Sequence, residues 1–394
     1  MPLGAPPLSR DAVRALGLSR IREVANAGFG RTDIERFWFG ESDQTTPDYI
    51  RNSAIEAIRQ GKTFYSHNNG IAGLRSALSA YLSRLHGRPF APAQISVTSS
   101  GVSALMIAMQ ALLDPGDAVA MVTPVWPNVT EIPRILGAQV DRVALAPTPT
   151  GWRLDLDRLL SGITSRTRLV VLNSPGNPTG WVIPEEDQRA LLAHCRRLGV
   201  WLLCDDVYER LAFDPAKAVA PSFLKLADPE DRLIGVNSFS KSWLMTGWRL
   251  GWLVAPAAME TDLGKLTEYN TSCAPEFIQA AGVTALEEGE PHVAALRKSL
   301  MEASSFMTDQ LRAIEGVEIT PPTGGMYVML RVAGEDDAVS LCKRLVQEAR
   351  LGLAPGEAFG PESAGWIRWC IATDISRLRL GVERLKEWIA QSRK

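Results

Sequence analysis

Short apolar runs alternate with amphipathic stretches through the middle of this chain, and this alternation constrains its fold more than any other feature. Residues 118–124, 168–180, 200–206 and 231–240 each begin as a buried strand and end in small or polar residues. Residues 185–199 have acids early, bases late and a glycine at the end, as a helix prefers. Strands and helices that alternate in this way predict βαβ units and a mostly parallel sheet, flanked by helices.

The last third of the chain has a different pattern, which predicts a second, smaller α+β domain. Its predicted elements are helices at about 275–289 and 291–315, a strand, glycine turn and strand over 316–332, a helix at 336–350, a strand at 366–372 and a final helix. A helix predicted at about 10–26 has no obvious partner nearby and is placed with this domain. We therefore expect a large domain at 46–285 and a small domain formed by 1–45 and 286–394.

The bulk composition is that of an ordinary globular protein. The chain has 394 residues, 46% of them hydrophobic and 22% charged, with a net charge of −2. This balance does not suggest a nucleic-acid or membrane partner, and no apolar run approaches the ~18 residues that span a bilayer. The five cysteines form no CxxC pair and the four histidines form no HExxH motif, so we expect free thiols, no metal site and a cytoplasmic location.

The ends of the predicted strands carry reactive and polar side chains. In open α/β sheets ligands bind outside the carboxyl ends of the strands, which brings these segments to one rim. Lys241 follows the strand at 231–240, and a buried lysine has a lowered pKa and can form a Schiff base. Ser238 and Arg249 flank it and can bind an anion, the arginine as a bidentate fork.

A second anion site is predicted where a strand meets a long apolar helix. Ser100, Gly101 and Val102 stand at the start of that helix, where free backbone N–H groups attract a phosphate. An electrophilic carbonyl compound that carries a phosphate would satisfy both this site and Lys241. Pyridoxal 5′-phosphate is the obvious cofactor of this kind.

Four further residues have chemistry that complements such a cofactor. Asp205, at the end of the strand at 200–206, can pair with the pyridinium nitrogen and keep it protonated. Asn177 and Tyr208 can hydrogen-bond the ring hydroxyl, and Trp126 can stack on the pyridine ring. Each of these residues has an ordinary structural explanation when it is taken alone, as a turn, cap or core residue.

Together these segments resemble the class I/II aminotransferases, which are pyridoxal-phosphate enzymes of fold type I. The lysine segment, SFSKSWLMTGWRLGW, is similar to the Ser-x-x-Lys pattern of that family with its Gly-x-Arg-x-Gly downstream. Other segments resemble the family in the same order along nearly the whole chain: FGESDQTTPDYI, FYSHNNGIAGLRSAL, DPGDAV, NSPGNPTG, DDVYERLAF, PTGGMYV and LAPGEAFG. The chain departs from the family pattern in the Gly-Glu-Ser-Asp sequence of residues 40–43, where the family has Gly-Glu-Pro-Asp.

The resemblance implies a role for each matching residue. It makes Lys241 the Schiff-base lysine and proton shuttle. It makes Arg368 the ligand of the substrate's α-carboxylate, with Gly40 as a backbone contact, and it places Trp126 and Asn177 beside the substrate. It also implies that Tyr65 reaches the phosphate of a neighbouring subunit, and hence a homodimer. The remaining implied cofactor ligands are Ser100, Gly101, Val102, Asp205, Tyr208, Ser238 and Arg249.

The implied activity is transfer of an amino group between an α-amino acid and a 2-oxo acid by a ping-pong mechanism through a Lys241 aldimine. A carbon–sulfur β-lyase on the same fold is the main alternative. A non-catalytic regulator is a further one, although it would need an added DNA-binding module and a basic face. The substrate is left open, as is the question whether Trp38 and Phe39 line the substrate pocket.

Overall fold

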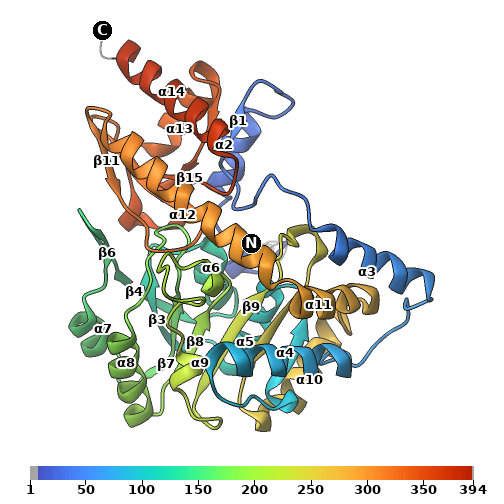
Figure 1. The fold of residues 1–394 in the computed structure, drawn as a ribbon. Coiled ribbons are helices and arrows are strands. Elements are labelled where there is room, and N and C mark those ends of the chain that lie inside the picture. Colours follow the sequence, from blue (N-terminus) through green and yellow to red (C-terminus); the bar gives the residue numbers. More distant parts are fainter. Residues whose placement is uncertain (1–7, 393–394) are drawn as a thin grey trace, which may run out of the picture.

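The computed structural model describes residues 8–392, and its centre is a seven-stranded sheet (Figure 1). Neighbouring strands run parallel except at β10, which is antiparallel to both strands beside it. Across the sheet the strands are β2 (Ile95–Thr98), β10 (Gly251–Val254), β9 (Leu233–Ser238), β8 (Trp201–Asp205), β7 (Thr167–Asn173), β3 (Ala118–Thr123) and β4 (Gln139–Ala144).

Helices cover both faces of this sheet, because successive residues of its strands are apolar and point to opposite sides. In β3, Val119 and Met121 pack with one helical layer, whereas Ala120 and Val122 pack with the other. The first layer contains α5 (Gly101–Leu112), α6 (Pro127–Ile135) and α10 (Glu260–Thr271). The second contains α4 (Ala72–His86), α7 (Leu156–Gly162), α8 (Glu185–Leu198), α9 (Phe223–Leu226) and α11 (Glu276–Glu288).

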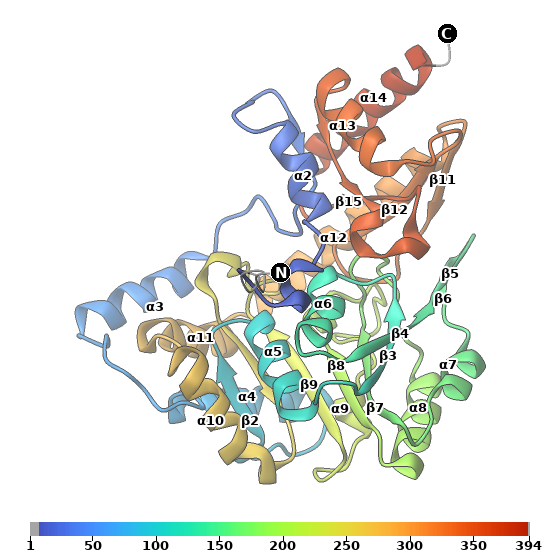
Figure 2. The ribbon, with the colours of Figure 1, turned by 180° about the vertical axis from the view of Figure 1, so that it is seen from behind.

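A second, smaller core lies beside the large sheet and uses both ends of the described chain (Figures 1 and 2). Its sheet is antiparallel, in the order β11 (Val317–Thr320), β12 (Tyr327–Val332), β15 (Ile367–Cys370) and β14 (Ala354–Pro355). Its helices are α2 (Arg20–Ala27), α12 (Glu290–Arg312), α13 (Ala338–Glu348) and α14 (Ile375–Ser392). The N-terminal strand β1 (Glu35–Arg36) pairs in parallel with β13 (Leu351–Gly352).

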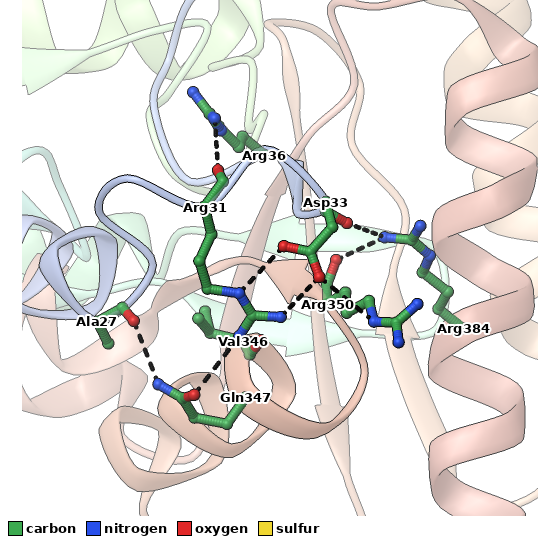
Figure 3. Close-up of polar contacts among 8 residues, drawn as sticks. All are labelled: Ala27, Arg31, Asp33, Arg36, Val346, Gln347, Arg350 and Arg384. Atoms are coloured by element: carbon green, nitrogen blue, oxygen red, sulfur yellow. Dashed lines mark hydrogen bonds and ion pairs between the residues drawn. The ribbon is translucent and has the colours of Figure 1, made fainter.

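An arginine-rich cluster also ties the N-terminal segment to the C-terminal elements (Figure 3). The guanidinium group of Arg31 donates to the Asp33 carboxylate at 2.8 and 3.1 Å, and to the carbonyl oxygen of Val346 at 3.2 Å. Arg350 lies 3.4 Å from the same carboxylate, and Arg384 donates to the backbone oxygens of Asp33 and Arg350. These contacts hold the segment that precedes β1 against α13 and α14.

The predicted fold class is confirmed: the large sheet is mostly parallel and flanked by helices, and the smaller part is α+β. The prediction of a single helix at about 10–26 was wrong. The chain forms a short α1 (Asp11–Arg14) and then α2, because Gly17 separates them and the Ser19 hydroxyl caps the second helix by accepting from Arg22 N. Helix α2 packs in the small core as predicted. The domain boundaries given above remain a prediction.

The other predicted elements agree with the structure to within a few residues. The sequence analysis predicted neither β10 nor β4 of the large sheet, nor the helices α3 (Asp48–Arg59), α4 and α7. Four cysteines are buried and Cys273 is partly buried, and all five are free. No helix within residues 8–392 is both long enough and apolar enough to cross a membrane.

Candidate active site

One cavity lies where the strands β7, β8 and β9 end, between the large sheet and the N-terminal segment. It brings together side chains from distant parts of the sequence, as the strand-end argument predicted. Among the predicted site residues, those that line it are Gly40, Gly101, Val102, Trp126, Asn177, Asp205, Tyr208, Ser238, Lys241, Arg249 and Arg368. Ser100 lies directly behind its wall, and Tyr65 lies elsewhere, on the surface.

Lys241 stands in the turn after β9, and its side chain enters the cavity. Its Nζ donates to the carbonyl oxygen of Gly40 and lies 6.0 Å from the centre of the Tyr208 ring. Enclosure by protein disfavours the charged ammonium form and lowers the pKa of Lys241 to about 8. A substantial fraction of this amine is therefore neutral, and nucleophilic, near physiological pH.

Asp205 is the last residue of β8, and it is buried. Burial raises the pKa of its carboxyl to about 7, while a hydrogen bond from Val207 N at 3.3 Å and the positive charge of Lys241 oppose that rise. It is the one carboxylate among the described residues that line the cavity. A cationic ligand beside it would favour its ionised form.

Asn173, the last residue of β7, connects two of the predicted ligands, and sequence reasoning missed it. Its Nδ2 donates to the backbone oxygen of Asp205 at 2.9 Å, and its Oδ1 accepts from Asn177 N at 2.7 Å. The amide therefore fixes the position of both strand-end loops. Its place at the end of an apolar strand, directly before the Gly/Pro turn, was a signal that could have identified it.

The N-terminus of α5 forms one end of the cavity. Ser100 is the N-cap, and its Oγ accepts from Ser103 N at 3.0 Å, so the helix starts at Gly101 with free N–H groups. Gly251 in β10 lets the helix approach the sheet, since a Cβ there would lie 2.6 Å from the backbone nitrogen of Gly101. These N–H groups and the helix dipole form the kind of site that binds an anion.

Two hydroxyl groups and an arginine lie at the same end of the cavity. Ser238 Oγ and Ser240 Oγ are 2.9 Å apart. Arg249 lies in the left-handed region with φ of 56°, and its guanidinium group donates to Thr246 O at 2.6 Å. Partial burial lowers the pKa of Arg249, as expected for a cation without an acidic partner. Hydroxyl donors, helix N–H groups and a cation together suit a phosphate group.

Arg368, from β15, lies at the other side of the cavity and is 2% exposed. Its guanidinium group donates to Asn177 Oδ1 at 2.8 Å and to the backbone oxygen of Trp38 at 2.5 Å. Its Nε is buried without a hydrogen-bond partner among the described residues. The guanidinium group is thus held in place, and its Nε–H and its positive charge remain available for a carboxylate ligand.

Two tyrosines and a glycine complete the wall near Lys241. The hydroxyl groups of Tyr208 and Tyr327 are 2.7 Å apart, and the centre of the Tyr327 ring lies 4.4 Å from the guanidinium carbon of Arg368. Burial raises the pKa of Tyr327 to about 12, so its hydroxyl stays protonated. A Cβ on Gly40 would collide with the Tyr327 hydroxyl, so the close approach of this loop requires glycine.

The sequence did not decide whether Trp38 and Phe39 line the substrate pocket, and the structure places one in the core and the other at the cavity. Trp38 is 4% exposed and belongs to the small core, whereas Phe39 lines the cavity. The cavity also contains residues that the sequence reasoning did not name: Ile21, Leu105, Asn173, Val207, Ser240, Thr246 and Tyr327. Ile21 and Leu105 lie on helices far apart in the sequence, and no local pattern brings them together.

The structure thus combines a large, mostly parallel sheet, which has a lysine and an anion site at its strand ends, with a smaller α+β part. The sequence model for aminotransferase class I and II matches residues 37–385. The chain therefore belongs to the class I/II aminotransferase family, and it is a transaminase, as the sequence resemblance predicted.

The relatives with which it compares support this assignment. It is 31% identical to an aspartate aminotransferase of Thermotoga maritima over 91% of this chain and 92% of that protein. It is 32% identical to an aspartate aminotransferase of Rhizobium meliloti over 97% and 96% of the two chains. The crystal structure of the Thermotoga maritima aspartate aminotransferase superimposes with a TM-score of 0.89 at 28% identity, over 97% of this chain and 100% of that one.

Proposed function

We propose that this transaminase holds pyridoxal 5′-phosphate in the cavity through Lys241 and uses it to move amino groups between an α-amino acid and a 2-oxo acid. The observation that carries the proposal is the convergence of three groups on one cavity. These are the Lys241 amine, the anion site at the start of α5, and the buried Asp205 carboxylate. When bound, the cofactor supplies a carbonyl that condenses with amines and a protonated ring that withdraws electrons.

The residues present fit this cofactor. Its phosphate matches the end of the cavity with helix N–H groups, serine hydroxyls and a cation, and that end has no carboxylate among the described residues. Its pyridinium nitrogen matches Asp205, the carboxylate that burial has left without a cationic hydrogen-bond partner in the described chain. We assign the phosphate to Ser100, Gly101, Val102, Ser238 and Arg249.

Lys241 carries the covalent attachment and the proton transfer. Its lowered pKa makes the neutral amine available for attachment near pH 7 to 8. With the cofactor and an amino donor bound, the neutral Nζ would be the base that removes the proton from the donor's α-carbon. The same Nζ then returns that proton on the cofactor side, as a general acid. Gly40 O, which now accepts from Nζ, orients the amine toward the cavity.

Other residues tune and orient the reacting groups. Asp205 would keep the ring nitrogen protonated, and Asn173 holds the backbone of Asp205 in place. Asn177 and Tyr208 line the cavity and would donate to the ring hydroxyl, and Trp126, at the start of α6, would stack on the ring. Arg368 binds the substrate's α-carboxylate with its unused donor, beside Asn177 and the Gly40 backbone.

We also propose a homodimer in the cytoplasm. Tyr65 is 88% exposed and the neighbouring Phe64 is 78% exposed, which is unusual for adjacent aromatic residues and suits an interface with a second copy. In that dimer Tyr65 would reach the phosphate of the neighbouring site. The free thiols of all five cysteines suit a reducing compartment.

The test is the half-reaction of the purified, cofactor-loaded protein. Addition of an amino acid alone should bleach the visible absorbance of the cofactor, and a 2-oxo acid should restore it. Initial rates against both substrates should give the parallel double-reciprocal lines of a ping-pong mechanism. Release of ammonia and pyruvate from cysteine conjugates, without transfer to a 2-oxo acid, would instead support the β-lyase alternative.

A further inference from the structure

The cavity has an apolar end, where the side chains of Ile21, Phe39 and Leu105 have no part in the cofactor assignment. Ile21 of α2 and Phe39, which follows β1, line it from the N-terminal segment. Val102 and Leu105 of α5 and Trp126 line it from the large sheet. Ile21 and Leu105 are almost fully buried, whereas Phe39 is 38% exposed. Apolar side chains from two separate parts of the fold therefore surround the space beside the cofactor.

The position of Phe39 relates this apolar end to the substrate. The backbone oxygen of the preceding residue, Trp38, accepts from Arg368, the proposed ligand of the α-carboxylate. The backbone oxygen of the following residue, Gly40, accepts from Lys241. Phe39 thus lies between the groups that would hold the carboxylate and the amino nitrogen of a substrate. The side chain on the α-carbon must then enter the space that Phe39 lines.

Among the described residues of one chain, the charged groups that line the cavity leave no partner for a second carboxylate. Within residues 8–392 the cations that line it are Lys241, Arg249 and Arg368, and each already has a role. A carboxylate that enters an apolar space without a cation loses its hydration without compensation.

One other cation lies near the entrance. The guanidinium carbon of Arg22 is 6.0 Å from the centre of the Phe39 ring, and the residue is exposed. Arg22 does not line the cavity, so it is positioned to pack on the outer side of Phe39 rather than to meet a substrate.

We propose that Phe39 determines substrate specificity and that the enzyme prefers amino donors with a large uncharged apolar side chain, aromatic or aliphatic, over the dicarboxylic amino acids. This inference rests on the proposed function of the cavity. The apolar residues that line its substrate space favour desolvated hydrocarbon over charge.

The experiment compares the cofactor-loaded protein with three variants. These are Phe39→Ala, Arg22→Met and the control Phe29→Ala, which removes an 87% exposed phenylalanine of the same segment. Each is titrated with phenylalanine, leucine, alanine, aspartate and glutamate, and kcat/KM for the half-reaction is measured for each donor. Retained visible absorbance of the bound cofactor shows that a variant is folded and loaded.

We expect the unaltered enzyme to use phenylalanine or leucine at least ~10-fold better than aspartate. Phe39→Ala should lower kcat/KM for phenylalanine ~10-fold or more. It should leave kcat/KM for alanine within about twofold of that of the unaltered enzyme, since the alanine side chain does not reach the lost ring. Arg22→Met and Phe29→Ala should leave the ranking of the donors unchanged.

A preference for aspartate or glutamate would overturn the inference. If Arg22→Met then lost activity with these two donors only, Arg22 would be the residue that binds the side-chain carboxylate of the substrate. An equal decrease in kcat/KM for phenylalanine and for alanine as donors, in the Phe39→Ala variant, would also overturn the inference. All of these results leave the proposed function intact. Absence of a half-reaction with every donor would refute the proposed function itself.

Discussion

Replacing Asp205 by asparagine should stabilise the cofactor-free protein at alkaline pH and at the same time disable the loaded enzyme. The carboxyl is buried at the end of β8, and its Oδ1 accepts a hydrogen bond from Val207 N at 3.3 Å, which asparagine can also accept. Burial raises its pKa from 3.8 to about 7. The native residue therefore carries a charge that the cofactor-free fold disfavours.

The sign and size of the effect follow from this pKa. A folded state with a raised carboxyl pKa binds its proton more tightly than the unfolded chain, so the stabilisation is complete below pH ~4 and is lost as the pH rises through 7. The difference between 3.8 and about 7 corresponds to ~4 kcal/mol of unfolding free energy above pH 7, of which about half is already lost at pH 5.5. Asparagine has no charge and avoids this loss.

The assay is chemical denaturation of the cofactor-free protein at pH 5.5 and pH 8.5. The stability of Asp205→Asn relative to the unaltered protein should increase by ~2 kcal/mol between these values. Asp214→Asn is the matched control, because this carboxyl is partly exposed. Its pKa is lowered, by a hydrogen bond from the backbone of Ala216 above all, so the relative stability of this variant should not increase with pH.

The loaded Asp205→Asn enzyme should lose ~100-fold or more in kcat/KM, the cost of leaving a buried cation without its partner. An equal stability difference at both pH values would refute the reasoning, since it would mean that Asp205 acts only through its neutral hydrogen bonds. Unchanged activity would refute its assignment to the ring nitrogen.

Three further substitutions test other contacts. Arg368→Lys keeps the charge but cannot reproduce the bonds to Asn177 and Trp38, so KM for every amino donor should rise ~10- to 100-fold while the cofactor absorbance persists; an unchanged KM in stopped-flow titrations would contradict the assignment. Tyr65→Phe should weaken cofactor retention ~10-fold in equilibrium dialysis, and full retention would argue against a shared site. Asn173→Ala frees the Asp205 loop and should lower kcat more than it changes KM for the donor, whereas a change in thermal stability alone would make it purely structural.

The sequence was sufficient to predict the helices and strands whose apolar residues follow a regular pattern. The apolar strands β3, β7, β8 and β9 were recognisable because both of their faces are buried, and their ends located Asp205, Asn177 and Lys241. Strand β10 escaped recognition because it is short and follows the Arg249 loop directly, so that its tryptophan and glycine looked like part of that loop. Its pairing with β2 and β9 is decided by contacts far apart in the chain.

The candidate site divides in the same way. Residues at strand ends and at the N-terminus of α5 could be predicted, since the geometry of parallel sheets collects them at one edge. Ile21, Leu105 and Tyr327 could not, because only the packing of the two parts of the fold brings them to the cavity. The single helix predicted at about 10–26 failed because the hydrophobic pattern continues past Gly17, whereas the Ser19 cap starts a new helix.

The most direct test of the central claim is the site of covalent attachment. The cofactor-loaded protein is treated with borohydride, which makes the bond between cofactor and lysine permanent, and the peptides are then mapped by mass spectrometry. We expect one adduct per chain, on Lys241, and none in Lys241→Ala. An adduct on another lysine of the unaltered protein, or an undiminished adduct in Lys241→Ala, would contradict the proposed active site.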